Sequence, residues 1–318
     1  MLSFDQAQSR FAESVAPVRE AETVWLELAA GRVLARQLAA RGDEALPAAG
    51  TLLQPGHIAA LAAQGHTEVP VFRLVEVALL IADDRTANDL PATDRPDANG
   101  PMLEALVQSL GALVRRRKHV ADDERRLHDA LVDLADPGGG GAGRAAVGGA
   151  WGEWECDVVF VSGASHRLGA ALVSAGGELI CRQVDMQPGR TVLLGRLRDC
   201  PVVCLPADPV AAYITFVLLA TPMIRRLQGR ASIFPPVDRL APTFAVPRQW
   251  AGDGAADAFW GVARAPGGDG TGRVHAAAQP WGSVATLGDA AGLVRLAPPM
   301  SGRTQPHVPY YDLSRWLC

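Results

Sequence analysis

Cysteine and aromatic residues are scarce in this chain of 318 residues, and their scarcity excludes several classes of protein. The five cysteines are an odd number, and their spacing matches no disulfide framework. Cys200 and Cys204 lie close together, but no His or Cys follows them at zinc-finger distance. Buried free thiols are therefore favoured over a metal site. The seven histidines never form a His-Glu-x-x-His pattern, so the sequence does not support a zincin-type zinc site.

Long apolar runs are also missing. The longest, residues 210–224, contains Tyr213, two threonines and Pro222, and it is too short to cross a bilayer. The first residues include Asp5 and have no apolar core, which is unlike a signal peptide. Free thiols and the lack of a targeting signal favour the reducing cytoplasm.

Charge of neither sign dominates, and the net charge of −4 argues against a general nucleic-acid binder. The densest basic segment is 115–119, but alternate side chains of a strand point to opposite faces, and acids follow at 122–124. A solvated edge with ion pairs is favoured over nucleic-acid contact. The glycine run at 138–143 is followed by no Gly-Lys-Ser/Thr, and it comes after a predicted helix, so we interpret it as a linker rather than a phosphate loop.

Residues 1–73 are predicted to form an arm of helices and turns. Helical spacing of apolar residues extends over 3–16, with Ser3 as the cap, and over 20–40. Turns follow around 47–56, then a short helix over 57–64 and a connector over 68–72.

Residues 74–230 are predicted to form an α/β/α domain on a parallel sheet. Strands that alternate with helices produce such a sheet, with helices on both of its faces. The expected strands are 75–81, 112–120, 157–161 and a strand from 201, and the expected helices are 102–110, a helix capped by Asp122 that ends at 134, and a helix from Pro209. Residues 231–318 combine Pro and Gly turn signals with short alternating segments, which predicts a small β-barrel.

The most informative stretch is 201–209. An apolar strand ends at Pro206, Asp208 is a good N-cap, and Pro209 suits the first helical position. A strand, a tight turn and a helix start point free backbone N–H groups at a ligand, and ligands lie beyond the strand ends of open α/β sheets. We predict the edge of the active site here.

A second loop of small residues, Ser162-Gly163-Ala164-Ser165, follows a predicted strand. Such a loop lets a ligand approach the backbone closely, but tight turns use the same residues, and spacing leaves both interpretations open. His166 stands in the same loop.

Several short motifs occur in an order that points to one family. They are Leu28–Ala35 for "A-x-GRVLA", 55–72 for "PG…LASLGxxEVPV", Asp97-Ala98-Asn99 for Asp-Ser/Thr-Asn, Ser162-Gly163 for the start of "SGGVSVGD", 187–190 for "KPGK", 205–212 for "LPGNPVSA" and 281–296 for a barrel motif. With these motifs the chain resembles the molybdopterin molybdenumtransferases, the family of MoeA and the gephyrin E domain, over nearly its whole length.

The resemblance implies a molybdopterin-binding domain whose relatives insert molybdate into adenylylated molybdopterin and release AMP, with the assistance of Mg²⁺. It implies catalytic roles for Asp84 and Asp97, of which Asp84 is also the metal candidate. The implied ligand contacts are Asn99, Ser162, Gly163, Ser165, Gln187, Gly189, Arg190, Pro206, Asp208 and Pro209. The arm implies a homodimer or a heterodimer with a family member. Nucleic-acid and membrane partners are not expected, because of the net charge and the lack of a long apolar run.

The chain also departs from the family pattern. The family's inserted lid domain, which carries "DNSAMDGYAV", is absent, and Gln183 and Gln187 stand where the family has lysines. Asp208 replaces the Asn of "LPGNP", whereas Arg85 and Arg167 add cations. Fewer carboxylates and more cations disfavour Mg²⁺. Two hypotheses follow: an enzyme of molybdenum-cofactor biosynthesis, or a non-catalytic paralogue that binds molybdopterin or acts as a scaffold.

Overall fold

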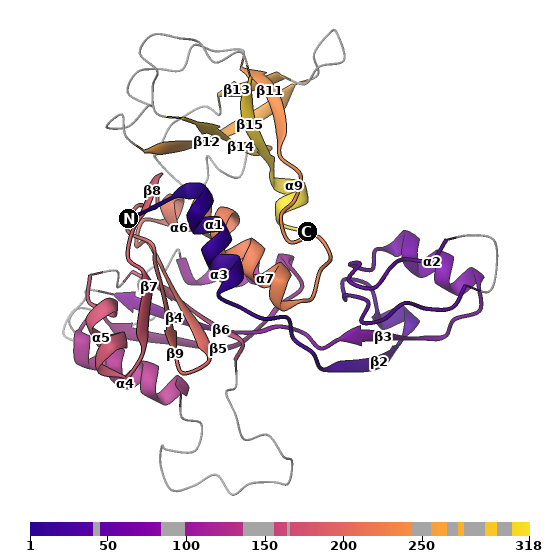
Figure 1. Cartoon of the computed structure of the whole chain (residues 1–318), viewed down its shortest axis with the longest axis horizontal. Helices are drawn as coiled ribbons and strands as arrows, with labels where there is room; N and C mark the ends of the chain where they lie inside the picture. The colour runs from indigo at the N-terminus through magenta and orange to yellow at the C-terminus, as the bar shows by residue number, and fades with distance from the viewer. Residues whose placement is uncertain are drawn as a thin grey trace, which may run out of the picture.

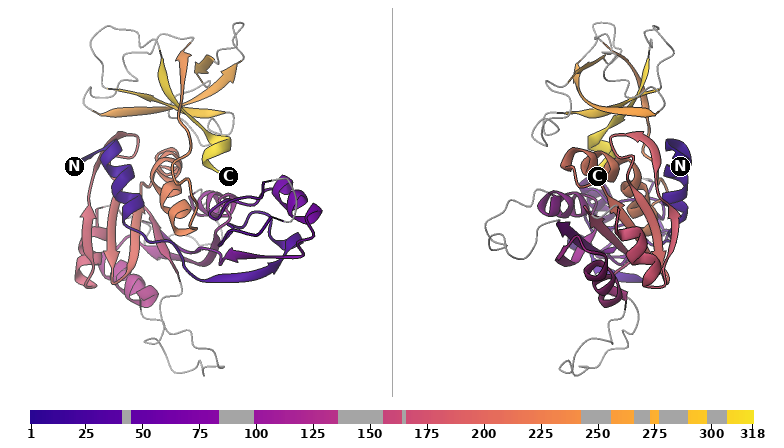
Figure 2. Two further views of the ribbon diagram at one scale, coloured as in Figure 1. Left: turned by 45° about the vertical axis from the view of Figure 1, so that its right-hand side comes forward. Right: turned by 90° about the vertical axis from the view of Figure 1, so that its left-hand side faces the viewer.

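The computed structural model describes residues 1–40, 45–83, 99–135, 156–163, 166–242, 256–265, 273–276, 290–297 and 307–318. Figure 1 shows an α/β domain, an arm that extends to its side and a β-barrel above it. Figure 2 shows the same arrangement from two further directions. The α/β domain adjoins both other parts and carries the predicted ligand loops.

A six-stranded sheet forms the centre of the α/β domain, in the order β5-β4-β6-β10-β9-β7. The first four of these strands are parallel, β9 is antiparallel to β10, and β7 is antiparallel to β9. The predicted parallel sheet is thus confirmed for four strands, whereas β7 and β9 were not predicted from the sequence. The bounds are Glu76–Asp83 (β4), Leu113–Ala121 (β5), Val158–Ser162 (β6), Glu178–Cys181 (β7), Leu193–Leu197 (β9) and Cys200–Leu205 (β10).

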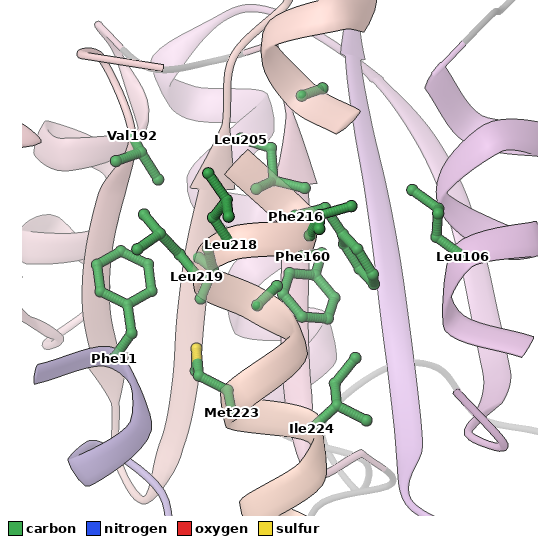
Figure 3. Close-up of a cluster of buried hydrophobic side chains, with 14 of the residues drawn as sticks. Phe11, Leu106, Phe160, Val192, Leu205, Phe216, Leu218, Leu219, Met223 and Ile224 are labelled. Atoms are coloured by element: carbon green, nitrogen blue, oxygen red, sulfur yellow. The ribbon is translucent and has the colours of Figure 1, made fainter. Parts of the chain in front are cut away.

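Helices cover both faces of this sheet because successive residues of a strand point to opposite faces. Leu79 and Phe160 belong to the core cluster under α1, α3, α6 and α7, while Leu80 belongs to the cluster under α4 and α5. In the first cluster, the ring centroids of Phe160 and Phe216 are 5.5 Å apart (Figure 3). The bounds are Phe4–Glu13 (α1), Asn99–Ser109 (α3), Glu124–Ala135 (α4) and Leu168–Ser174 (α5).

The helix predicted after β10 is the main helix of the core. It consists of α6 (Pro209–Thr215), a π-helical turn (Phe216–Ala220) and α7 (Thr221–Leu227). By length and composition it is the one helix of the described residues that could cross a membrane, but it is 89% buried inside the fold. Its apolar character is therefore explained by its place in the core.

The start of α4 differs by one residue from the prediction. Asp123, not Asp122, accepts a hydrogen bond from the backbone N–H of Arg126, at 3.1 Å. The helix begins at Glu124, so Asp123 occupies the capping position. The side chain of Asp122 instead forms an ion pair with Arg167, at 3.0 Å.

The basic segment 115–119 lies on β5, the edge strand of the sheet. Arg115 pairs with Glu76 at 2.6 Å, and Lys118 pairs with Asp133 at 2.9 Å. These contacts agree with the interpretation of a solvated edge with ion pairs. The glycine run lies outside the described residues.

The arm corrects two predictions. Residues 20–40 are not a helix: Ala21–Trp25 form strand β2, and a 3₁₀ turn follows at Leu26–Leu28. The predicted connector over 68–72 is strand β3 (Glu68–Phe72), which pairs with β2 in antiparallel register. Thr23, Val24 and Trp25 favour strands, and the distant partner β3 decides against the helical spacing. The short helix predicted over 57–64 is present as α2, Pro55–Ala63.

The C-terminal part is a small β-barrel, as predicted. Five strands close a ring in which β12 pairs with both β13 and β14, while β11 and β15 complete it. β8 (Val184–Gln187) adds to β12, and β1 (Leu2–Ser3) adds to β8. The bounds are Asp238–Pro242 (β11), Asp257–Ala265 (β12), Arg273–Ala276 (β13), Gly292–Leu296 (β14) and Val308–Asp312 (β15), followed by α9 (Leu313–Trp316). The barrel motif at 281–283 lies outside the described residues.

Two largely buried arginines hold the C-terminal segment against the α/β domain. Arg225 donates hydrogen bonds to the carbonyls of Arg315 and Cys318, and Arg230 donates to those of Cys318 and Leu110, at 2.5–2.9 Å. Burial, and then the neighbouring Arg225, lower the pKa of Arg230 to about 10. Arg230 is therefore still charged at neutral pH, and each of its bonds to a carbonyl is charge-assisted.

Candidate functional site

A buried amide joins three loops at the carboxyl edge of the parallel strands. The side-chain Nδ2 of Asn99, at the start of α3, donates to Ser162 Oγ at 2.8 Å and to the carbonyl of Ala207 at 2.9 Å. Asn99 is only 8% exposed, and its Oδ1 has no hydrogen-bond partner among the described residues. The loops after β6 and β10 and the start of α3 therefore lie together, as the sequence motifs predict for a common site.

Gly163 closes this edge because no other residue fits there. Its φ is +105°, and its N–H donates to the carbonyl of Leu205 at 3.2 Å. A Cβ atom at this position would lie 2.4 Å from the carbonyl oxygen of Ala82, at the end of β4. The bare backbone thus lets the ends of β4, β6 and β10 approach one another closely.

The start of α6 has the predicted geometry, and it already carries a negative charge. Asp208 is the N-cap and accepts a hydrogen bond from the N–H of Ala211 at 2.8 Å, with Pro209 as the first helical residue. Pro206 is buried, whereas Asp208 is exposed. The carboxylate therefore occupies part of the positive end of the helix that an anionic ligand would use.

The residues of the "KPGK" position lie along α6 rather than beside Asn99. Gly189 (φ +110°) packs so closely on Thr215 that a Cβ atom would lie 2.5 Å from the threonine Oγ1. Gln187 is exposed, and its backbone pairs with Ala258 of the barrel. Arg190 lies 3.6 Å from the carboxylate of Asp185.

A large cleft lies beside α5. Arg167 does not line it, and donates instead to the backbone carbonyl of Asp122 at 2.5 Å, in addition to its ion pair with that residue. His166 lines the cleft, which has a volume of about 860 Å³. The other lining residues are Met1, Gly169, Ala170, Val173, Ser174, Arg182, Gln183 and Leu193. Asn99, Ser162 and Asp208 are not among the described residues that line it.

Arg182 and Ser174 were not predicted from the sequence as candidate ligand contacts. Arg182 lies in the turn between β7 and β8, and Ser174 is the last residue of α5. The short apolar run Leu179-Ile180-Cys181 was the signal for β7, and this strand places Arg182 at the cleft.

The described residues do not provide a site for Mg²⁺. No three His, Cys, Asp or Glu side chains of the described ranges gather in an arrangement that could hold a metal ion. Asp84, Asp97 and Ser165 lie outside the described residues, as does Arg85. The carboxylate of Asp208 caps its own helix, so it is already engaged as a hydrogen-bond acceptor.

The five cysteines are free, and four of them are buried, as their spacing predicts. A hydrogen bond with Cys156 and burial raise the pKa of the Cys200 thiol well above its usual value. A thiol of this kind is a poor nucleophile. Burial also raises the pKa of the Cys181 thiol.

We expect Asn99→Ala to loosen the sheet edge, because the loops after β6 and β10 lose the donor that joins them. The free energy of unfolding in urea is expected to fall by about 1–3 kcal/mol. The matched control is Gln108→Ala on the same helix, where an exposed side chain makes a long contact of 3.5 Å with Glu104. Equal stability of the two variants would contradict the bridging role of Asn99.

Comparison with known proteins gives one consistent result. The chain is 28% identical over 204 residues to a molybdopterin molybdenumtransferase of Nostoc, which covers 62% of this chain and 43% of that protein. It is 25% identical over 197 residues to the Haemophilus influenzae protein of the same name, covering 60% and 44%. The chain thus matches less than half the length of these relatives. No protein-family model matches it.

Solved structures define the fold. The molybdopterin biosynthesis MoeA protein of Pyrococcus horikoshii superposes with a TM-score of 0.72 over 98% of this chain and 99% of the other, at 16% identity. A molybdenum cofactor biosynthesis protein of Pyrococcus furiosus gives a TM-score of 0.67 over 98% and 100%, at 22% identity. The chain therefore has the fold of the MoeA proteins. In sequence it is similar to the molybdopterin molybdenumtransferases over less than half of their length.

Proposed function

We propose that this chain acts in molybdenum-cofactor biosynthesis by binding molybdopterin, or its adenylylated form, at the carboxyl edge of the parallel sheet. The relatives' names supply the pathway, and the fold supports the same place for the site. The observation that carries the proposal is the Asn99 bridge, which joins the three loops that bear family motifs and leaves a buried amide oxygen with no partner among the described residues.

Each part of this edge has a task in the proposal. The small loop at Ser162 and Gly163 admits the planar ligand to the backbone, and Asn99 Oδ1 accepts a hydrogen bond from it. Pro206, Pro209 and the loop between them form the opposite wall. Ser165, Asp84 and Asp97 would complete the site from outside the described residues, with Asp97 and Asp84 positioning molybdate. Mg²⁺ has no support among the described residues.

The second candidate function is non-catalytic: the chain would bind molybdopterin without inserting molybdate, or would act as a scaffold that pairs with a family member. The carboxylate of Asp208 at the start of α6 favours it, because this charge repels the ligand's phosphate. We place either protein in the cytoplasm, in agreement with the free cysteines, and as a homodimer or heterodimer through its arm.

Calorimetry with adenylylated molybdopterin tests binding. We expect heat of binding, and an affinity that falls as salt rises, because the ligand is anionic and its contacts are partly exposed. Absence of heat at every ionic strength would contradict the proposed site. Complementation of a strain that lacks the family enzyme separates the two functions: we expect no restored molybdoenzyme activity, and restoration would establish catalysis.

The Asp208→Asn variant tests the charge at the helix start. Asn caps a helix as well as Asp does, so the fold is expected to be unchanged. Removal of the negative charge is expected to tighten binding of adenylylated molybdopterin by about 3- to 10-fold at low salt. Calorimetry with both proteins measures the change, and Asp312→Asn, which alters the cap of α9 instead, is the control. An unchanged affinity would mean that the ligand's phosphate does not approach α6.

A further inference from the structure

Two buried thiols lie on the same face of the central sheet, at the amino ends of neighbouring strands. Cys200 is the first residue of β10, and Cys156 precedes β6 by two residues. The strands β6 and β10 are parallel neighbours, with Val159 opposite Val202. Cys156 and Cys200 both belong to the core cluster under α4 and α5. Both side chains therefore point to one face, at the edge of the sheet opposite the Asn99 bridge.

The two thiols are in contact. The Sγ of Cys200 hydrogen-bonds with the side chain of Cys156 and lies 3.8 Å from the backbone carbonyl oxygen of Cys156. Cys156 is 7% exposed, and Cys200 is 3% exposed. Neighbouring strands of a sheet are about 4.8 Å apart, and a disulfide joins residues whose Cα atoms are about 4.4–6.8 Å apart. The two positions thus fit a disulfide between β10 and the segment that leads into β6.

The residue between Cys156 and β6 is fixed in place. The carboxylate of Asp157 accepts hydrogen bonds from the guanidinium of Arg73 at 2.7 and 2.8 Å, and from the backbone N–H of Glu76 at 2.8 Å. Because these bonds anchor Asp157, its neighbour Cys156 has little freedom to move away from Cys200. The two sulfur atoms are therefore positioned in advance for a reaction with each other.

The protonation state of Cys200 determines which thiol reacts first. The hydrogen bond with Cys156, then burial and the nearby carboxylate of Asp157, raise the pKa of the Cys200 thiol, so it is protonated at neutral pH. A protonated thiol reacts slowly with an oxidant from solvent, because the thiolate is the nucleophile. Cys156 is the more exposed of the two thiols, so we assign the first oxidation to it.

We propose that Cys156 and Cys200 form an oxidation site, at which hydrogen peroxide converts the two thiols into a reversible disulfide. In the first step the sulfur of Cys156 takes one oxygen of the peroxide, the O–O bond breaks, and water leaves a sulfenic acid behind. In the second step the sulfur of Cys200 attacks the sulfur of Cys156, and the S–O bond breaks. The hydroxyl leaves as a second water with the proton of the Cys200 thiol. Overall the two thiols lose two electrons and two protons, and the peroxide gains them.

The disulfide would join the two strands whose carboxyl ends carry the candidate site. Strand β6 ends at Ser162, and β10 ends at Leu205, whose carbonyl accepts the N–H of Gly163. A disulfide between residues 156 and 200 closes a long loop, and such a link stabilises the fold by restricting the unfolded chain. The ratio of folded to unfolded protein is expected to rise at least ~10-fold on oxidation. This inference does not rest on the proposed function.

Mass spectrometry of the full chain tests the proposal. All measurements use a Cys318→Ser chain, because the exposed Cys318 thiol reacts with peroxide on its own. Folded protein is treated with hydrogen peroxide, then unfolded, alkylated and digested without a reductant. We expect two of the four buried thiols to be protected from alkylation, and one cross-linked peptide that joins Cys156 to Cys200. Fragment spectra distinguish Cys200 from Cys204, and dithiothreitol is expected to restore both thiols.

Single variants assign the two roles. Cys156→Ala and Cys200→Ala are each expected to remove the cross-link and the gain in stability on oxidation. In Cys200→Ala the sulfenic acid is expected to remain on Cys156, where dimedone labels it, whereas Cys156→Ala is expected to give no label on Cys200. The matched control is Cys181→Ala, which removes a buried thiol from the core cluster on the other face and is expected to leave the cross-link unchanged.

Three results would overturn the proposal. The first is the absence of a cross-linked peptide from the folded chain, and the second is a cross-link from Cys200 to Cys204 or Cys181 instead. The third is an equal yield of the Cys156–Cys200 cross-link in protein unfolded with urea, because the fold would then not bring the two sulfurs together. The peptide of the chain that keeps all four buried thiols decides the matter even if a variant does not fold. Failure to bind adenylylated molybdopterin would contradict the proposed function alone, because that ligand takes no part in these measurements.

Discussion

The variant Gly163→Ala is expected to unfold at a free energy about 2–4 kcal/mol below that of the unchanged chain. Two effects destabilise the folded state of this variant. An alanine at φ +105° is strained, and its Cβ would lie 2.4 Å from the backbone oxygen of Ala82. Because that oxygen belongs to β4, the strand itself must move. Urea unfolding followed by circular dichroism measures the loss.

The control for this prediction is Gly176→Ala. Gly176 also has a positive φ, +85°, but nothing lies within 4 Å of its Cβ position. Only the backbone strain applies there, and the expected cost is about 1 kcal/mol. The difference between the two variants isolates the close approach of β4 and β6. If the two losses are equal, the site edge is not packed as tightly as these distances require.

Gly163→Ala is also expected to impair binding at the edge. Repulsion between the new Cβ atom and β4 displaces the end of β6, where Ser162 accepts the 2.8 Å hydrogen bond of Asn99. The affinity for adenylylated molybdopterin is expected to fall by more than ~10-fold, while Gly176→Ala leaves it unchanged. Calorimetry on folded protein without urea, at a temperature well below the midpoint of unfolding, separates this effect from stability.

The variant Arg295→Met is expected to lower the free energy of unfolding by about 3 kcal/mol. Arg295 of β14 pairs with Asp257 at 2.7 Å and with Asp5 at 2.6 Å, and it lies over the ring of Phe4. Burial alone lowers the pKa of Arg295, but its hydrogen bonds to Asp257 and Asp5 outweigh burial and raise it. Loss of the arginine leaves the largely buried Asp257 without its cation.

The two acids allow a matched control. The side chain of Asp5 is 69% exposed, whereas that of Asp257 is 13% exposed. Asp5→Asn is therefore expected to cost less than about 1 kcal/mol, because solvent screens an exposed pair. Adding Asp257→Asn to Arg295→Met is expected to recover part of the lost stability. A double variant as unstable as the sum of the single changes would show that Arg295 and Asp257 are not coupled.

This pair matters because it lies where the barrel meets the α/β domain. Phe4 of α1 packs against Phe259 of β12, with ring centroids 4.6 Å apart, and against Tyr311 of β15, with centroids 6.4 Å apart. An apolar contact of this kind resists hinge motion. We therefore expect the barrel and the sheet edge to move together when a ligand binds.

Local sequence patterns predicted secondary structure correctly where the interactions that fix a segment lie within that segment. The helix start at Asp208-Pro209 has the expected cap, because the capping bond joins residues three apart in sequence. The strands at β4, β6 and β10 were found because buried strands are continuous apolar runs. The predictions were wrong where the secondary structure depends on a segment distant in sequence. Residues 21–25 form a strand rather than the predicted helix because β3 pairs with them.

The candidate site likewise has features that the sequence predicted and features that only the folded chain shows. The sequence pattern was enough to place Ser162 and Asp208 at the ends of predicted strands, since the carboxyl ends of parallel strands meet at one edge. That Asn99 joins these two loops could be seen only in the folded chain. The sequence alone could not decide which cations are available to a ligand. Arg167 lies close to Asp122 only in the folded chain, and the turn that places Arg182 in the cleft follows a strand that pairs with β9.

The sequence by itself thus determined the fold class, the β-barrel and the loops of the sheet edge, because hydrophobic period and capping residues act over a few positions. The tertiary structure alone decided the pairing of β2 with β3, the closure of the edge around Gly163 and the partners of each arginine. The physical reason is range: an ion pair or a steric contact depends on distance in space, and residues 45 positions apart, such as Asp122 and Arg167, meet only after folding.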